Sequence, residues 1–302
     1  MQEKNMNTSQ IRSAPDIGDD DPDPQLDDFQ DYLWSDLMAR RIGIGLMAEE
    51  FARATRAVYE EIYDAEAGDI AVRGRLVNAA IAMEQFVADE TARLIAGAGS
   101  FAEGETVELQ AIGDQDQFNA AYPDARTKSG APLPFTLQHV ALGRAAAELT
   151  RRGAQVDAYR GDCHAELACR RQAVGLGKAM AAKLLGVRDK KYDRWENDAR
   201  LAPSGAGGGA SNRVPRGLIA ELQAMDDFIA TTAAALPVGN IGDTSVVYVI
   251  DDQEEFERVY PQARTHRDGT PYPRRVLFLA AARRASELAR TGRQVRIAVA
   301  DD

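Results

Sequence analysis

The stretch KAMAAKLLGVRDKKYDRWEN, residues 178–197, decides the fold of the chain around it. Read with the helical period, it contains two apolar stripes, formed by Ala181, Ala182 and Leu185 and then by Tyr192 and Trp195. Gly186 interrupts the helical pattern between the two stripes. Two short helices joined by a tight turn that contains glycine form a helix-turn-helix, and we predict one here.

The outward positions of the second predicted helix are basic, namely Arg188, Lys190, Lys191 and Arg194. A helix that lies along a polyanion presents such a face. By position, the first three of these side chains would reach base edges, whereas Arg194 and Arg200 would hold phosphates. Lys178, at the start of the preceding helix, would contact another phosphate beside free backbone amides. Taken one at a time, each of these residues could equally be a solvated surface charge.

This unit resembles the DNA-binding motif of the Xre/Cro-repressor family, whose usual run is LA-x-x-LGV-x-x-x-x-V-x-x-WE. The chain has the corresponding residues at 181–187, an apolar Tyr192 at the next motif position, and Trp195-Glu196 at the end. The resemblance implies that the unit binds double-stranded DNA and regulates transcription. The alternative is a helical hairpin in an ordinary protein core.

The net charge of the chain is −11 at pH 7, which argues against bulk, non-specific binding of nucleic acid. Most of the excess acid lies in residues 1–36, so a local basic helix can still dock on DNA, with a modest and salt-sensitive affinity. We expect residues 1–28 to be a disordered acidic tail, because like charges and prolines dominate there. This tail could solubilise the chain, bind a partner or mimic DNA.

Several classes of function find no support in the sequence. The three histidines, His139, His164 and His266, are scattered, and no nucleophile elbow or metal-ligand spacing occurs. Cys163 and Cys169 are the only cysteines, and their spacing fits no common zinc pattern. We therefore expect no enzymatic activity, no metal and no cofactor. No apolar run reaches the length of a membrane span and the N-terminus lacks the apolar core of a signal peptide, which predicts a cytoplasmic protein.

The chain contains an internal duplication. The segment FNAAYPDART, residues 118–127, returns as FERVYPQART, residues 256–265. Further identities follow in the same order after one inserted residue: Arg144, Glu148, Leu149, Arg151, Gly153, Gln155 and Val156 recur as Arg283, Glu287, Leu288, Arg290, Gly292, Gln294 and Val295. So many identities in one order indicate a tandem repeat, with each copy about 130–140 residues long.

If the second copy begins with a helix-turn-helix, the first copy should begin with one as well. Residues 49–66 align with the motif, but Arg56 replaces the glycine of the turn and Ala65 replaces the tryptophan. The predicted third helix, residues 59–66, is acidic, and carboxylates that face phosphates weaken DNA binding. We interpret this first unit as degenerate for DNA binding and available for a protein contact.

An arginine and a glutamate have the same spacing in both copies, Arg41 with Glu66 and Arg171 with Glu196. In repressors of the Xre/Cro type, an arginine on the first helix pairs with the glutamate that closes the third helix. The resemblance therefore implies a structural pair in each copy. The alternative is that these residues are unrelated surface charges.

Beyond the helix-turn-helix, each copy is predicted to continue with a long helix, a strand, a Tyr-Pro segment, another long helix and a final strand. This order resembles the anti-CRISPR-associated helix-turn-helix regulators and their YdiL-like relatives. The resemblance implies a small α/β module through which two subunits dimerise, repression of the protein's own operon at an inverted repeat and, in some relatives, binding of messenger RNA. For this chain it implies a pseudo-dimer within one chain, or a homodimer.

We predict a mostly α, α+β fold built from two tandem copies of a helix-turn-helix domain and a small α/β dimerisation-like module. The expected parts are an acidic tail (1–28), a degenerate helix-turn-helix domain (29–95), a first α/β module (104–160), a DNA-binding domain with a Gly-rich flexible loop (163–236, loop 202–212) and a second α/β module (243–302).

Two functions are consistent with these observations. The first is a sequence-specific transcriptional regulator, an autorepressor whose second copy makes most of the DNA contacts. The alternative is a protein-interaction module, antitoxin-like or DNA-mimicking, whose acidic surface binds a basic partner. RNA binding is a variant of the first function, because a basic helix cannot by itself distinguish A-form from B-form backbones.

Overall fold

The computed structural model describes residues 32–197 and 214–300. Within these ranges the chain is mostly helical, with twelve helices and two small mixed sheets of three strands each. The predicted α+β class is confirmed at this level. The expected tail (1–28), the Gly-rich loop (202–212) and Arg200 lie outside the described residues. No helix in the described ranges combines the length and the apolar character that crossing a membrane requires.

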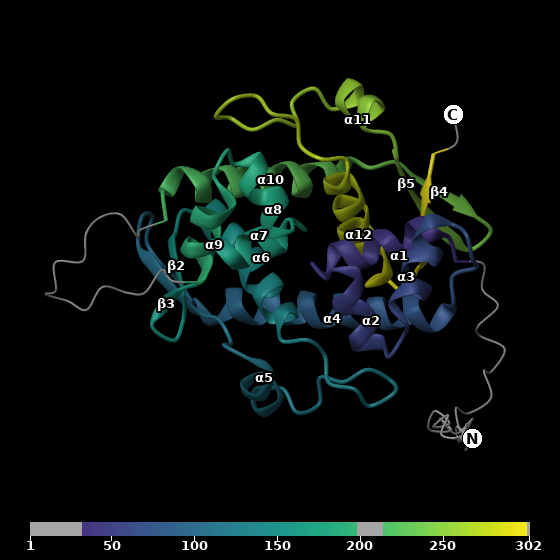
Figure 1. Ribbon diagram of the computed structural model, residues 1–302, viewed down its shortest axis with the longest axis horizontal. Coiled ribbons are helices and arrows are strands. Elements are labelled where there is room, and N and C mark those ends of the chain that lie inside the picture. The colour runs from purple at the N-terminus through teal and green to yellow at the C-terminus, as the bar shows by residue number, and fades with distance from the viewer. Residues whose placement is uncertain (1–31, 198–213, 301–302) are drawn as a thin grey trace, which may run out of the picture.

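The same order of elements occurs twice along the chain (Figure 1). The first half contains α1 (Trp34–Gly43), α2 (Ala48–Thr55), α3 (Tyr59–Ala67), α4 (Gly74–Gly97), β1 (Thr106–Gln110), α5 (Gln115–Ala121), α6 (Thr136–Arg151) and β2 (Gln155–Arg160). The second half contains β3 (Cys163–His164), α7 (Glu166–Ala173), α8 (Lys178–Leu184), α9 (Asp189–Asn197), α10 (Arg216–Ala235), β4 (Val238–Ile241), β5 (Thr244–Val249), α11 (Gln253–Val259), α12 (Arg275–Ala289) and β6 (Gln294–Val299). Apart from β3 and β4, each element of the second half has a counterpart in the first.

Each sheet contains a parallel pair of strands and one antiparallel strand at its edge. In the first sheet β1 and β2 are parallel, with Val107 opposite Val156, and β3 pairs antiparallel with β2. In the second sheet β5 and β6 are parallel, with Val247 opposite Ile297, and β4 pairs antiparallel with β5. The sequence analysis did not predict β3 or β4, because strands this short carry too little alternation to be recognised.

The helix that follows the first strand of each parallel pair begins at an aspartate. The Asp114 carboxylate accepts a hydrogen bond from the backbone N–H of Gln117 at 2.9 Å, and Asp252 accepts one from Glu255 at 2.7 Å. Each bond satisfies an amide that has no partner within its helix. These matching caps start α5 and α11 at equivalent positions, so the repeat in the sequence becomes a repeat in the structure.

The two halves exchange the helices with which they begin. α1 packs mainly against α12 and β6 of the second half, whereas α7 packs mainly against α6 of the first half. The Ser35 hydroxyl on α1 donates a hydrogen bond to the carbonyl oxygen of Ile297 at 2.9 Å, which ties α1 to β6. We call α1–α3 the first unit and α7–α9 the second unit. Each unit therefore rests on elements of the other half.

Close packing at both exchanged contacts depends on a glycine that faces an alanine. A Cβ atom added to Gly43 on α1 would lie 2.6 Å from the Cβ of Ala282 on α12. A Cβ added to Gly143 on α6 would lie 2.7 Å from the Cβ of Ala173 on α7, and closer still to the backbone of Cys169. The glycine thus lies on the exchanged helix in one contact and on its partner in the other. The two contacts occupy equivalent positions in the two halves, but the glycine and the alanine are interchanged between them.

Two arginines cap the exchanged helices near the centre of the molecule. Arg144 on α6 donates to the carbonyl oxygen of Gly43 at 2.7 Å, and Arg283 on α12 donates to that of Ala173 at 3.1 Å. Each bond satisfies a carbonyl group at the C-terminus of a helix. Arg283 also pairs with Asp226; burial favours a higher pKa for this carboxyl group, but the arginine charge outweighs burial and holds the pKa below its usual value. Because α1 packs on α12 and α7 packs reciprocally on α6, the two halves are related by an approximate two-fold axis.

Candidate nucleic-acid interface

The second unit is held together by a compact apolar core. Its buried side chains include Leu167, Ala181, Ala182, Leu185, Tyr192 and Trp195. The apolar stripes in residues 178–197 therefore face the core, as the helical period predicts. Tyr192 and Trp195 are core residues and are not available to stack on bases.

A residue in the left-handed conformation ends α8 and leads the chain toward α9. Gly186 has a φ of +61°, a value that glycine adopts without strain. In the first unit Arg56 occupies the same place with a φ of +53°, and it is the only non-glycine residue with positive φ in the described part of the chain. Both units therefore keep the turn, but the first unit keeps it at an energetic cost.

We expect Arg56→Gly to raise the free energy of unfolding by about 0.5–1 kcal/mol. A side chain in the left-handed region costs about 1–2 kcal/mol, and the greater freedom of glycine in the unfolded chain offsets part of the gain. Urea denaturation followed by circular dichroism measures the change. Arg53→Gly, inside α2, is the control and should lower the same free energy by about 1 kcal/mol. Similar losses from both substitutions would contradict this explanation.

Both units contain the arginine–glutamate pair that their spacing indicates. On the second unit, Arg171 donates to the two carboxylate oxygens of Glu196 at 2.7 and 3.2 Å and to the carbonyl of Leu176 at 2.6 Å. In the first unit Arg41 donates to Glu66 at 2.6 Å in the same arrangement. All four side chains are buried. A buried two-bond pair fixes the third helix relative to the first, so both units have the same rigid scaffold.

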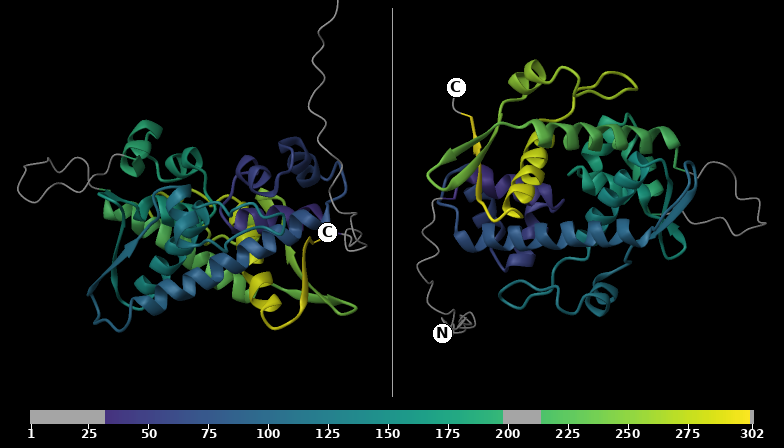
Figure 2. Two further views of the ribbon diagram at one scale, coloured as in Figure 1. Left: turned by 90° about the horizontal axis from the view of Figure 1, so that it is seen from below. Right: turned by 180° about the vertical axis from the view of Figure 1, so that it is seen from behind.

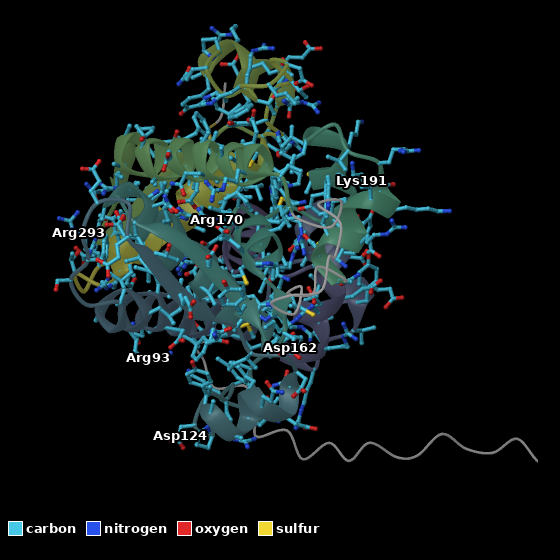
Figure 3. The ribbon with its side chains drawn as sticks, turned by 90° about the vertical axis from the view of Figure 1, so that its left-hand side faces the viewer. Arg93, Asp124, Asp162, Arg170, Lys191 and Arg293 are labelled. Carbon is cyan, nitrogen blue, oxygen red and sulfur yellow. The ribbon has the colours of Figure 1, made fainter. Side chains whose placement is uncertain are left out.

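Four exposed cations lie on the outer side of α9 and on the residue before it. They are Arg188, Lys190, Lys191 and Arg194, and we call them the basic face. The Lys191 ammonium lies 4.8 Å from the ring centre of Trp195, a cation–π contact, and Lys191 lies at the outer edge of the second unit in Figure 3. Within residues 32–197 and 214–300, the side chains of Arg188, Lys190 and Arg194 form no ion pair. These charges are therefore available to an anionic ligand.

Lys178, a predicted DNA contact, forms an ion pair within the second unit and is not part of the basic face. The Lys178 ammonium lies 2.8 Å from the carboxylate of Asp193 and 3.4 Å from the side-chain oxygen of Asn197. Its hydrogen bond and charge hold the pKa of Asp193 below the usual value. Lys178 thus neutralises an acidic side chain of α9 and ties α8 to α9, whereas Arg200 lies outside the described residues.

The first unit carries the opposite charge at the same positions. Glu60, Glu61 and Asp64 of α3 correspond to Lys190, Lys191 and Arg194 of α9. The carboxylate of Glu61 is paired with Arg75 at 3.0 Å. Two tyrosines and a valine are exposed beside the other two carboxylates. We call Val58, Tyr59, Glu60, Tyr63 and Asp64 the acidic-aromatic face.

The two units project from the same face of the molecule. Figure 2 (left) shows α2 and α3 at one end of this face and α8 and α9 at the other, above the long helices that support them. The two helices that carry the basic and acidic-aromatic faces, α9 and α3, therefore lie on one side of the protein. A flat or rod-shaped partner that met this side would encounter both.

The two cysteines are not joined in a disulfide. Cys163 is half-buried in β3 and Cys169 is buried in α7, and both thiols are free. Burial raises the pKa of the Cys169 thiol to about 12, which keeps it protonated. Among the described residues, no group of three or more histidine, cysteine, aspartate or glutamate side chains could hold a metal ion.

No protein-family model, no curated protein and no solved structure matches this chain. Its function is therefore inferred from the two faces and from the scaffold that holds them.

Sequence reasoning placed the basic face but missed the aromatic part of the first unit. Tyr59 and Tyr63 lie four residues apart on an exposed stripe of α3, separate from the stripe of the buried Ile62 and Ala65. The helical period could have indicated that both tyrosines point outward. The exposed Lys183 on α8 was also missed, because the motif directs the expected DNA contacts to α9.

Proposed function

We propose that the chain is a sequence-specific DNA-binding regulator that reads DNA mainly through α9. The observation that carries this proposal is the basic face, four exposed cations on a helix that the buried Arg171–Glu196 pair holds in place. Exposed lysine and arginine side chains on a rigid helix contact phosphates and guanine edges in the major groove. Repression of the protein's own gene is the form of regulation that we propose.

We further propose that the chain is a covalent pseudo-dimer of two helix-turn-helix regulators. The exchange of α1 and α7 between halves is the packing expected where two subunits have been joined into one chain. In two-fold dimers the recognition helices enter successive major grooves about 34 Å apart. Of the two helices at the recognition position, α9 carries exposed cations and α3 carries no basic residue, so we expect an asymmetric operator with one dominant half-site.

The test is fluorescence-anisotropy binding to a duplex from upstream of the protein's own gene, beside a scrambled duplex, across a salt series. We expect preference for the native duplex and a log–log salt slope that corresponds to a few phosphates. Lys190→Glu with Lys191→Glu should weaken binding at least about 100-fold, because each good base contact contributes about 1–3 kcal/mol. Equal, weak binding to both duplexes would contradict the proposal.

A matched control separates this effect from a general change of charge. Arg290→Glu with Arg293→Glu makes the same change in net charge, and Arg293 lies on the side of the molecule opposite Lys191 in Figure 3. This variant should keep most of the affinity. An RNA duplex of the same sequence distinguishes DNA from RNA as the target, since a preference for A-form geometry would appear as tighter RNA binding.

A further inference from the structure

The acidic-aromatic face contains clustered apolar side chains that are exposed to solvent. Nine large hydrophobic side chains are exposed in the described part of the chain, and six of them lie between residues 33 and 70. On α3 and at its start, Val58 is 64% exposed, Tyr63 61% and Tyr59 43%. The two tyrosine rings stack on each other with centroids 6.4 Å apart. Clustered exposed apolar groups rimmed by charge are typical of a protein contact.

The charges of this face are the complement of those on α9. Glu60 and Asp64 correspond in position to Lys190 and Arg194, and Val58 corresponds to Arg188. The chain therefore carries both members of a complementary pair of helices, at equivalent places on one side of the molecule. Arginine side chains also pack well on tyrosine rings, so the exposed tyrosines suit the basic face as well as the carboxylates do.

We propose that two copies of the chain dock face to face, with α3 of each copy against α9 of the other. The reciprocal packing of α1 on α12 and of α7 on α6 relates the two units by an approximate two-fold axis, and both units project from one face. A second copy turned over onto this face brings α3 onto the partner's α9 and α9 onto the partner's α3 at the same time. Both contacts form together in a closed assembly, as in most two-fold dimers.

This assembly covers the basic face, so a second copy and DNA compete for α9. Dimerisation would then hold the regulator in a form that cannot bind its operator, and dilution or operator DNA would release it. The dimer itself forms without DNA. Its test is therefore independent of the proposed function, and either idea can fail while the other stands.

The experiment is sedimentation equilibrium of the full chain without DNA. We expect a monomer–dimer equilibrium whose dissociation constant rises roughly tenfold between about 50 and 200 mM salt, because the paired charges are exposed to screening. Glu60→Lys with Asp64→Lys gives a chain with two basic helices. Lys190→Glu with Arg194→Glu gives a chain with two acidic helices. Each variant alone should be monomeric, because like charges face each other in its dimer.

Mixing the two variants provides the decisive control. One chain then presents two basic helices and the other two acidic helices, so a heterodimer regains both complementary contacts. We expect the equimolar mixture to dimerise, and circular dichroism to show that each variant is folded. A monomeric wild-type chain, a dimer that persists in either variant alone, or a mixture that stays monomeric would each overturn the proposal. A monomeric wild type that binds a lysine-rich helical peptide through Glu60 and Asp64 would instead assign the face to a different basic protein.

Discussion

Arg171→Met is expected to lower the free energy of unfolding by about 3–5 kcal/mol. The substitution removes both hydrogen bonds from Arg171 to Glu196, which is 3% exposed, and leaves that carboxylate only a longer contact, 3.8 Å, with the Lys178 ammonium. It also leaves the carbonyl of Leu176 without its donor. An uncompensated buried charge costs far more than the net contribution of the intact pair, which is why the loss is large. Urea denaturation followed by circular dichroism measures it.

Three comparisons show whether burial is the cause. Lys178→Met breaks the exposed pair with Asp193 and removes the 3.8 Å contact with Glu196, but it leaves both hydrogen bonds from Arg171 to Glu196 in place. It should cost about 1 kcal/mol or less, because water solvates Asp193 when its partner is removed. Arg41→Met removes the matching cation of the first unit and should cost as much as Arg171→Met. Removing both charged partners with Arg171→Met and Glu196→Leu should recover part of the loss. An Arg171→Met variant as stable as the Lys178→Met variant would refute the argument.

Gly143→Ala is expected to lower the free energy of unfolding by about 3 kcal/mol, at the upper end of the usual cost of overpacking. The added methyl group would overlap the backbone of Cys169 and lie 2.7 Å from the Cβ of Ala173, so α6 and α7 would have to move apart. Backbone atoms cannot avoid the methyl group by changing rotamer. Gly217→Ala is the control, since Gly217 begins a helix with open space around it, and it should stabilise the protein by about 0.5–1 kcal/mol.

The opposite contact allows a rescue. Gly43→Ala places a methyl group 2.6 Å from the Cβ of Ala282, and it should also destabilise the protein. Adding Ala282→Gly moves the methyl group from α12 to α1 without changing the packed volume. We expect the double variant to regain most of the lost stability in the same denaturation experiment. A double variant no more stable than Gly43→Ala would show that the contact does not limit stability.

The local structure of this protein was predictable because local patterns determine it. The apolar stripes of residues 178–197 define two helices and leave the basic face outward, and the arginine–glutamate pairs have equal spacing because both units contain the same order of three short helices. The pairing of Lys178 with Asp193 was not predictable, because residues 15 positions apart meet only when α8 and α9 take their relative angle.

The exchange of α1 and α7 between the two halves could not be predicted from the sequence, for a different reason. When two halves are repeats, a helix of one half fits its own long helix and that of the other half through nearly the same apolar pattern. The choice depends on small residues such as Gly43 and Gly143, and on the length of the connection between the halves. β2 and β3 are separated by two residues, which holds α7 beside α6.

The exchanged packing also determines the order in which the chain can mature on the ribosome. α7 follows α6 closely in the sequence, so this pair can form as soon as both have left the exit tunnel. α1 is made first and joins a core with α4 of its own half, yet its most extensive contact is with α12, the last helix to appear. The side of α1 formed by Ala39 and Ile42, which packs on second-half residues, must therefore wait for nearly complete synthesis before it is covered. Nascent chains arrested before α12 would be substrates for chaperones and proteases. The C-terminal elements α12 and β6 complete the packing of the N-terminal helix α1.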